Sequence, residues 1–140
     1  MNPDELILIT GPAGFLGARL VRELLERYPK AALALLIRDK PGQSGKQRAD
    51  LIVPPSEQSR VQVYSGDVGK PKCGLEQSAY QRLSAETTRV IHCAATVRFD
   101  HSLDEARQIN VEGTRRVLDF AAAAPRLQSF AYVGTAYVAG

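Results

Sequence analysis

Short apolar runs alternate with longer amphipathic segments along the whole chain. Five runs have the length and composition of strands: residues 6–10, 31–37, 61–64, 89–95 and 129–133. Three segments between them have helical periodicity: residues 14–28, 75–86 and 103–123. Strands that alternate with helices form right-handed βαβ units, so we predict an α/β fold with a doubly wound parallel sheet (Rossmann) and strand order 3-2-1-4-5.

The spacing of apolar residues also predicts how the helices pack. In the first helix an apolar residue recurs at every fourth position, at Leu16, Leu20, Leu24 and Tyr28. In the last helix Ile109, Gly113 and Val117 share a face, and we expect Gly113 to allow close contact with the sheet. Residues 40–60 are rich in Gly, Pro, Ser, Gln and charge, which predicts a long loop with one helical turn near residues 49–52.

The first strand leads directly into a glycine-spaced turn, Thr10-Gly11-Pro12-Ala13-Gly14-Phe15-Leu16-Gly17. Gly11 allows a sharp turn, Gly14 lets a diphosphate come close, and Gly17 lets the helix pack on the strand. The backbone N–H groups of residues 14–16 and the helix dipole then form an anion site. A tight turn without a ligand is the alternative, but the strand–turn–helix context favours a dinucleotide. No Gly-Lys-Ser/Thr follows, which argues against a P-loop.

The ends of the predicted strands carry the remaining candidate chemistry, because ligands bind doubly wound sheets at that edge. Arg38 ends the second strand, where an acid would bind the ribose of NAD and an arginine can grip the 2′-phosphate of NADP. The adjacent Asp39 leaves NAD open, and a solvated surface arginine is the alternative for Arg38. Lys40, Lys46 and Arg48 follow in the predicted loop, where solvated side chains are the simpler interpretation.

Three other strand ends carry candidates with simpler alternatives. Asp67 could accept a hydrogen bond from an adenine amino group, or form an Asx turn. Ala94 and Ala95 are small where a dinucleotide would lie on the sheet edge, although ordinary strand packing also favours alanine. Thr135 could polarise a carbonyl oxygen over the crevice, or end the fifth strand.

Bulk composition excludes several classes of protein. The 140 residues form one domain, and 44% hydrophobic with 24% charged residues is typical of a globular chain. The net charge of +3 is spread along the chain, which does not indicate nucleic acid, and no apolar run approaches the roughly 20 residues of a membrane span. Cys73 and Cys93 lack metal-ligand spacing, so we expect free thiols, no metal and a cytoplasmic location. His92 and Cys93 lie in a predicted buried strand, which favours a core histidine and an inert thiol.

Taken together, these residues resemble the extended short-chain dehydrogenase/reductase superfamily over nearly the whole chain. The similar motifs are the glycine turn, Gly66-Asp67-Val68, Val90-Ile91-His92-Cys93-Ala94-Ala95 and Asn110-Val111-Glu112-Gly113-Thr114. Within the superfamily, Arg38 and the run Val133-Gly134-Thr135-Ala136-Tyr137-Val138-Ala139-Gly140 are most similar to the fatty acyl-CoA reductase and thioester reductase branch.

The resemblance implies a reductase that uses NADP(H), in preference to NAD, to reduce an acyl thioester to an aldehyde or alcohol. It implies that Thr135 hydrogen-bonds the substrate carbonyl and that Asn110 is the family asparagine near the active site. The motif serine before that threonine is replaced by Gly134. The cofactor-binding residues that we predict are Gly11, Ala13, Gly14, Phe15, Leu16, Gly17, Arg38, Asp67, Val68, Ala94, Ala95 and Thr96.

One departure from the superfamily concerns the proton donor, a tyrosine in Tyr-x-x-x-Lys. No lysine lies four positions after Tyr28, Tyr64, Tyr80 or Tyr132. Tyr137 lies too close to Thr135 to be the proton-donor tyrosine. We therefore expect residues 1–140 to be the N-terminal, cofactor-binding portion of a longer reductase, with the sheet cut after its fifth strand. Such a portion would bind substrate only through later residues and would be inactive alone.

Two alternative functions remain open at this point. One is a non-catalytic dinucleotide-binding module, and the other is a sugar-nucleotide epimerase or dehydratase of the same superfamily. The second would favour an acid in place of Arg38. An uncovered fifth strand also leaves a homo-oligomer open, because bare strand edges pair with other copies.

Overall fold

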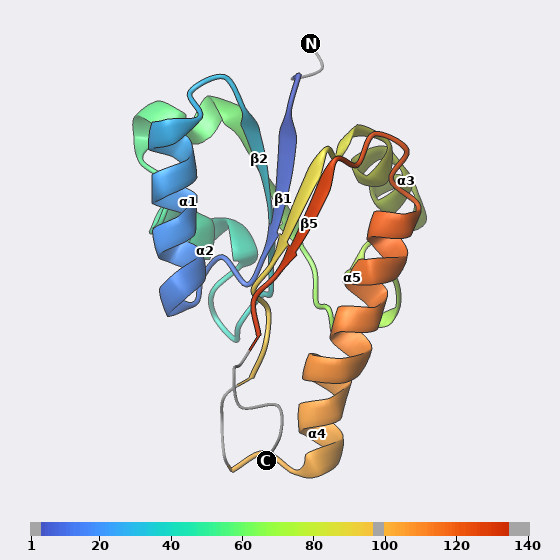
Figure 1. The fold of residues 1–140 in the computed structure, drawn as a ribbon. Coiled ribbons are helices and arrows are strands. Elements are labelled where there is room, and N and C mark those ends of the chain that lie inside the picture. Colours follow the sequence, from blue (N-terminus) through green and yellow to red (C-terminus); the bar gives the residue numbers. More distant parts are fainter. Residues whose placement is uncertain (1–3, 97–99, 135–140) are drawn as a thin grey trace.

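A parallel sheet with the predicted order β3-β2-β1-β4-β5 forms the centre of the molecule (Figure 1). The computed structural model describes residues 4–96 and 100–134. Its strands are β1 (Leu6–Thr10), β2 (Ala32–Ile37), β3 (Val61–Ser65), β4 (Arg89–His92) and β5 (Ser129–Tyr132). In the register, Ile9 of β1 lies opposite Leu35 of β2 and Ile91 of β4, so the carboxyl ends of the central strands meet at one edge. The predicted fold class is confirmed.

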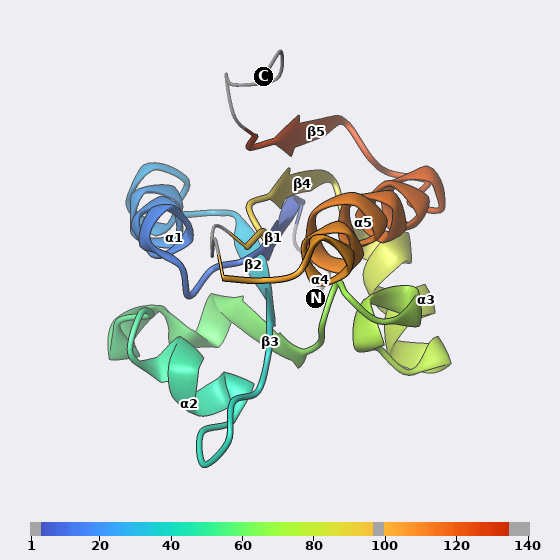
Figure 2. The ribbon, with the colours of Figure 1, turned by 90° about the horizontal axis from the view of Figure 1, so that it is seen from below.

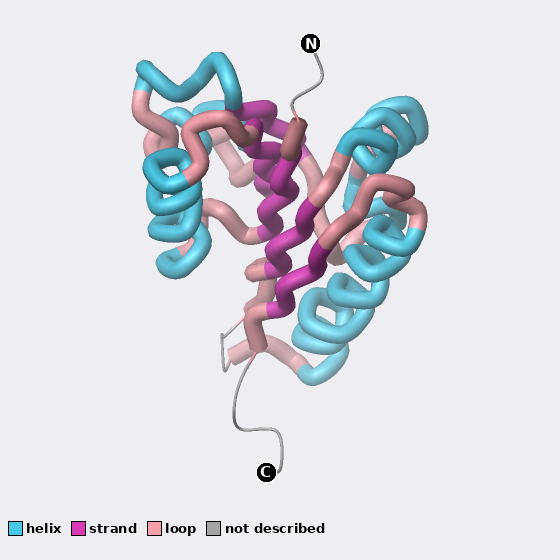
Figure 3. Tube along the Cα trace, turned by 45° about the horizontal axis from the view of Figure 1, so that its top comes forward, coloured by secondary structure: helices cyan, strands magenta, loops and turns pink. Residues whose placement is uncertain are grey.

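Helices cover both faces of this sheet, as the view from below in Figure 2 shows. On one face lie α1 (Phe15–Arg27) and α2 (Gly45–Asp50), and on the other lie α3 (Gln77–Glu86) and α5 (Gly113–Ala122). Every residue of β1 and β2 is buried, because each strand has helices on both sides. The same layering is visible along the chain trace in Figure 3. In the described part of the chain, no helix has the length and apolar character needed to cross a membrane.

The buried face of α1 differs from the predicted one. Gly17, Val21 and Leu25 are buried, whereas Leu16 and Tyr28 are 46% and 49% exposed. A Cβ on Gly17 would lie 2.0 Å from the carbonyl oxygen of Gly11, so the helix touches the turn at this glycine. This backbone contact sets the rotation of α1 about its axis, and residues one turn apart from Gly17 follow it into the core.

Residues 40–60 contain two helices where we predicted a long loop with one helical turn near residues 49–52. The predicted turn overlaps the end of α2, but the long loop is wrong. Ser44 starts α2 with a capping box, in which the Gln47 N–H donates to Ser44 Oγ (3.1 Å) and the Ser44 N–H donates to Gln47 Oε1 (2.8 Å). The 3₁₀ helix η1 (Pro55–Arg60) follows, and Arg60 donates to the carbonyl of Ala31 (2.9 Å). The Ser-x-x-Gln spacing of Ser44 and Gln47 was the sequence signal for α2.

The predicted helix over residues 103–123 is continuous but has three parts, visible along the lower right of Figure 1. These are α4 (Leu103–Arg107), the π-helical segment η3 (Gln108–Glu112) and α5. A Cβ on Gly113 would lie 2.9 Å from Val68 Cγ2, so the helix packs closely here, but against the connection after β3 and not against a strand of the sheet as predicted. A π-helical turn inside an α-helix is uncommon and often marks a functional position.

The last two strands are shorter than predicted. β4 stops at His92. The Cys93 N–H still reaches the Thr10 carbonyl (3.2 Å), but it also donates to Thr10 Oγ1, and the Ala94 N–H donates to this hydroxyl as well, both at 3.1 Å. β5 pairs only with β4 among the described residues, and Tyr132 is 60% exposed at this edge.

Candidate functional site

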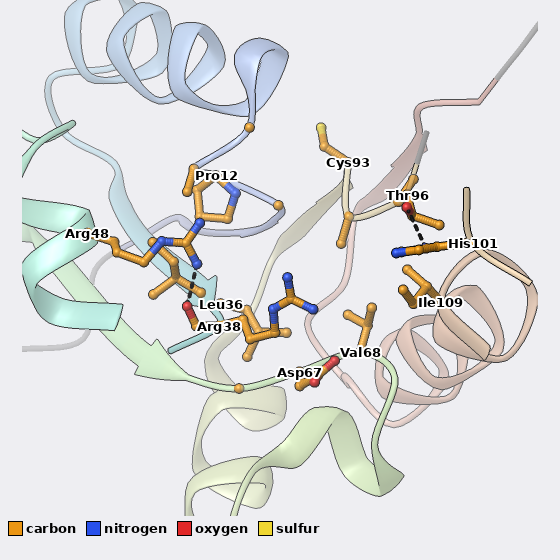
Figure 4. Close-up of a pocket in the computed structure, with 17 residues that line it drawn as sticks. Pro12, Leu36, Arg38, Arg48, Asp67, Val68, Cys93, Thr96, His101 and Ile109 are labelled. Carbon is orange, nitrogen blue, oxygen red and sulfur yellow. Dashed lines mark hydrogen bonds between the residues drawn. The ribbon is translucent and has the colours of Figure 1, made fainter. Parts of the chain in front are cut away.

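A cavity of about 450 Å³ opens at the carboxyl edge of the sheet (Figure 4). This volume is within the range of small-molecule sites. The predicted residues that line it are Gly11, Ala13, Gly14, Arg38, Asp67, Val68, Ala94, Ala95 and Thr96. The structure therefore brings together residues from the ends of four strands at the point where the strand order reverses, as doubly wound folds do.

Three predicted cofactor residues do not line the cavity. The side chains of Phe15 and Leu16 are exposed at the first turn of α1, and Gly17 is buried beneath the turn. Thr135 lies outside the described residues, so its predicted role stays a prediction. Asn110 lies behind the cavity wall, in contact with Thr96.

The glycine turn positions the start of α1 beside the cavity. Gly11 has φ +67°, and a Cβ there would lie 2.7 Å from the backbone nitrogen of Ala94. The Gly14 N–H donates to the Gly11 carbonyl (3.3 Å), so the prediction that this amide is free is wrong. No side chain caps α1, which leaves the amides of Phe15 and Leu16 without partners among the described residues.

Two arginines lie at one end of the cavity, and both guanidinium groups point into it in Figure 4. Arg38 follows β2, and Arg48 reaches over from α2 and donates through Nη1 to the Arg38 carbonyl. Asp39 is engaged elsewhere: its Oδ1 accepts hydrogen bonds from the Gly45 N–H (2.5 Å) and Ser65 Oγ (3.0 Å). Arg48 was predicted to be a solvated side chain in a loop. The Ser-x-x-Gln spacing at residues 44–47 is the sequence signal that would have placed it on a helix.

Asp67 faces the cavity from the end of β3 (Figure 4). Its Oδ1 accepts from the Gly69 N–H (2.8 Å), so the Asx turn that was the alternative interpretation is present. Its N–H donates to the carbonyl of Cys73 (2.8 Å), where residues 72–74 are all left-handed with φ of 54°, 56° and 70°. The second carboxylate oxygen has no hydrogen bond to the described residues and is open to a ligand.

The segment after β4 forms the opposite wall. Asn110 holds Thr96 through two bonds: Asn110 Oδ1 accepts from the Thr96 N–H (2.8 Å), and Asn110 Nδ2 donates to the Thr96 carbonyl (3.2 Å). Thr96 Oγ1 also hydrogen-bonds His101 Nδ1 (3.1 Å), and His101 lines the cavity beside Ile109 (Figure 4). His101 was not predicted as a site residue, because no motif or periodicity marks a residue in this connection.

His92 and Cys73 lie behind the cavity and the half-buried Cys93 lines it, and neither thiol is an activated nucleophile. His92 hydrogen-bonds Thr10 and Thr114, which confirms the interpretation as a satisfied core histidine, and burial lowers the pKa of its ring. Burial raises the pKa of Cys73 to about 11 and also raises the pKa of Cys93, so both free thiols stay protonated near neutral pH. Within residues 4–96 and 100–134, no cluster of His, Cys, Asp and Glu side chains could hold a metal ion.

A parallel sheet with a glycine turn and a cavity at its switch point defines an α/β domain of the dinucleotide-binding class. The family model described as "Male sterility protein", a model of NAD-binding domains, matches residues 9–140. The chain belongs to this family. The resemblance that the motifs indicated is confirmed by this match.

Similar proteins are reductases of greater length. The chain is 35% identical to fatty acyl-CoA reductase 2 of Homo sapiens and 33% identical to fatty acyl-CoA reductase 1 of Rattus norvegicus, each over 94% of this chain and 28% of the relative. The terminal R domain from the myxalamid PKS-NRPS biosynthetic pathway superposes with a TM-score of 0.81 at 35% identity, over 94% of this chain and 35% of that one. The reductase (R) domain of the non-ribosomal peptide synthetase from Mycobacterium tuberculosis superposes with a TM-score of 0.74 at 31% identity, over 94% and 33%. The chain thus spans about a third or less of these relatives.

Proposed function

We propose that this chain is the NADP(H)-binding portion of a reductase that converts an acyl thioester to an aldehyde or alcohol. The observation that carries the proposal is the cavity at the sheet edge, with the glycine turn at its centre and Arg38 and Arg48 at one end. The names of its relatives, fatty acyl-CoA reductase and reductase domain, support an acyl substrate.

The donors and the space around the cavity fit a dinucleotide. The open amides of Phe15 and Leu16 and the positive end of α1 suit the diphosphate. The free oxygen of Asp67 suits the adenine amino group. The small side chains of Ala94 and Ala95 suit the nicotinamide half, which would supply the hydride when bound.

The charges at the end of β2 favour NADP over NAD. A 2′-phosphate carries negative charge that two guanidinium groups can neutralise with bidentate hydrogen bonds. Asp39, whose carboxylate would suit the ribose hydroxyls of NAD, is not among the residues that line the cavity, and its Oδ1 is held by the Gly45 N–H and by Ser65.

Arg38→Ala is expected to weaken NADP binding by about five- to 150-fold, from the roughly 1–3 kcal/mol of a charge-assisted bidentate contact. NAD lacks the 2′-phosphate, so its affinity should change by less than about threefold. Isothermal titration of both cofactors measures the difference. Arg27→Ala is the matched control, because Arg27 is exposed at the far end of α1 and pairs there with Glu23 (3.1 Å). Equal losses for NADP and NAD, or no loss, would contradict the NADP assignment.

Catalysis tests the second half of the proposal. We expect residues 1–140 to bind NADPH without oxidising it when a fatty acyl-CoA is added. The predicted proton donor is the tyrosine of Tyr-x-x-x-Lys, and residues 1–140 do not contain this motif. The role proposed for Thr135 is to hydrogen-bond the substrate carbonyl, and that for Asn110 is to support the adjacent wall. Absorbance of NADPH records turnover. Oxidation by residues 1–140 alone would show that the missing tyrosine is not needed. A longer natural form that carries Tyr-x-x-x-Lys yet stays inactive would instead favour a non-catalytic binding module.

A further inference from the structure

We propose that His92 is a positioning residue: it links the end of β1 to the first turn of α5 and, through Thr114, to the π-helical segment η3, and thereby fixes the cavity wall formed by residues 93–96. The ring is 1% exposed at the end of β4 and touches no part of the cavity surface. Its hydrogen bonds run to both sides of the site. That a dinucleotide lies against this wall rests on the proposed function, whereas the hydrogen-bond link does not.

The bonds at Thr10 assign one ring nitrogen. Thr10 Oγ1 accepts the Ala94 N–H (3.1 Å) and also the Cys93 N–H (3.1 Å), which is shared with the Thr10 carbonyl (3.2 Å), so both lone pairs of the hydroxyl face N–H donors. Its single proton is therefore left for His92 Nδ1, 2.6 Å away. Nδ1 must accept this bond, so it carries no proton.

The bonds at Thr114 assign the other nitrogen independently. Thr114 Oγ1 lies 2.7 Å from the backbone carbonyl of Asn110, which can only accept, so the hydroxyl proton points there. The same oxygen lies 2.9 Å from His92 Nε2 and must accept from it. The hydrogen bonds to Thr10 and to Thr114 thus require the same neutral tautomer of His92, with the proton on Nε2.

This chain of bonds continues to the cavity wall through Asn110. Asn110 lies within η3, where the π-helical turn shifts the backbone hydrogen bonds from the usual α-helical spacing. The Thr114 hydroxyl donates to the Asn110 carbonyl there. Its side chain holds both the N–H and the carbonyl of Thr96. Tyr132 of β5 stacks on the His92 ring with centroids 5.8 Å apart, which restricts the ring further.

The link acts on one half of the cavity. It reaches the backbone of residues 93–96 from two directions, through Thr10 and through Asn110. Arg38, after β2, is bonded by Arg48 of α2, and Asp67, after β3, is held by the Gly69 N–H. Gln108 of η3 also donates to the Gly69 carbonyl (2.7 Å), but no bond of the His92 link passes through Gln108. Loss of the link should therefore weaken contacts to the diphosphate and nicotinamide half of a dinucleotide and leave the adenosine end intact.

The first test is the protonation of His92 in the free wild-type chain. Nitrogen-15 NMR of the imidazole is expected to show a protonated Nε2 and a bare Nδ1 at neutral pH. A proton on Nδ1 would overturn the inference, whatever the chain binds.

The second test compares Thr114→Val with Thr114→Ser, since valine keeps the shape and removes the hydroxyl while serine keeps it. We expect Thr114→Val to bind NADP about tenfold more weakly, the order of one lost buried hydrogen bond. Its affinity for adenosine 2′,5′-bisphosphate should stay within about twofold of wild type, and Thr114→Ser should restore NADP binding to within about threefold.

Each other outcome has a definite meaning. Equal weakening of both ligands, or of neither, would overturn the inference, because a general loss of packing cannot favour one half of the ligand. Failure of serine to restore binding would overturn it too. A wild-type chain that binds neither ligand would overturn the proposed function, and with it the ligand half of this inference. The His92 tautomer would then support or overturn the remaining hydrogen-bond link.

Discussion

Gly17→Ala is expected to destabilise the fold by about 3 kcal/mol or more, because it forces an atom into closely packed backbone. The added Cβ would lie 2.0 Å from the Gly11 carbonyl oxygen and 2.9 Å from the Gly11 carbonyl carbon and Pro12 Cα. These are backbone atoms of the turn, so no side chain can move aside, and α1 would have to lift from the sheet. Urea unfolding followed by circular dichroism measures the loss.

The control for this prediction is Gly14→Ala, the same chemical change three positions earlier. A Gly17→Ala chain that unfolds at the same urea concentration as wild type would show that the turn and α1 shift together at little cost. In that case the rotation of α1 would have to be attributed to Val21 and Leu25 instead of the glycine contact.

Gly14→Ala is expected to leave the fold intact and to weaken both NADP and NAD about a hundredfold, roughly 2.8 kcal/mol at 1.4 kcal/mol per tenfold. Gly14 has φ −74° and ψ 171°, a conformation open to any residue, and a Cβ would meet only the Gly11 carbonyl oxygen at 3.5 Å. The protein itself therefore has room for this methyl group. The proposed diphosphate does not, because it would lie against the backbone there.

Calorimetric titration and thermal unfolding of the same Gly14→Ala preparation separate the two effects. Unchanged affinity would mean that the diphosphate does not lie on this turn, and the proposed function would lose its main support. A large drop in thermal stability would mean that Gly14 serves the fold instead. Together with Gly17→Ala, the variant separates a glycine required by packing from a glycine required by a ligand.

Much of this architecture can be predicted from patterns among residues that are close together in the sequence. The unbroken apolar runs of β1 and β2 indicate strands buried on both faces, and their alternation with helices specifies the strand order. The glycine spacing after β1 and the position of Arg38 after β2 locate the edge where the cavity forms. These features follow from local backbone preferences and from the handedness of βαβ units, which need no knowledge of distant contacts.

The details of the site were decided by contacts that form only once the chain has packed. Gly17 against the Gly11 carbonyl sets which face of α1 is buried, Arg48 reaches the Arg38 carbonyl from a helix, and His92 joins Thr10 to Thr114. Periodicity specifies which residues share a face of a helix but not how that helix is rotated against the sheet. It also does not specify which partner satisfies a buried polar group. Both depend on steric fit and hydrogen bonding after the chain has packed.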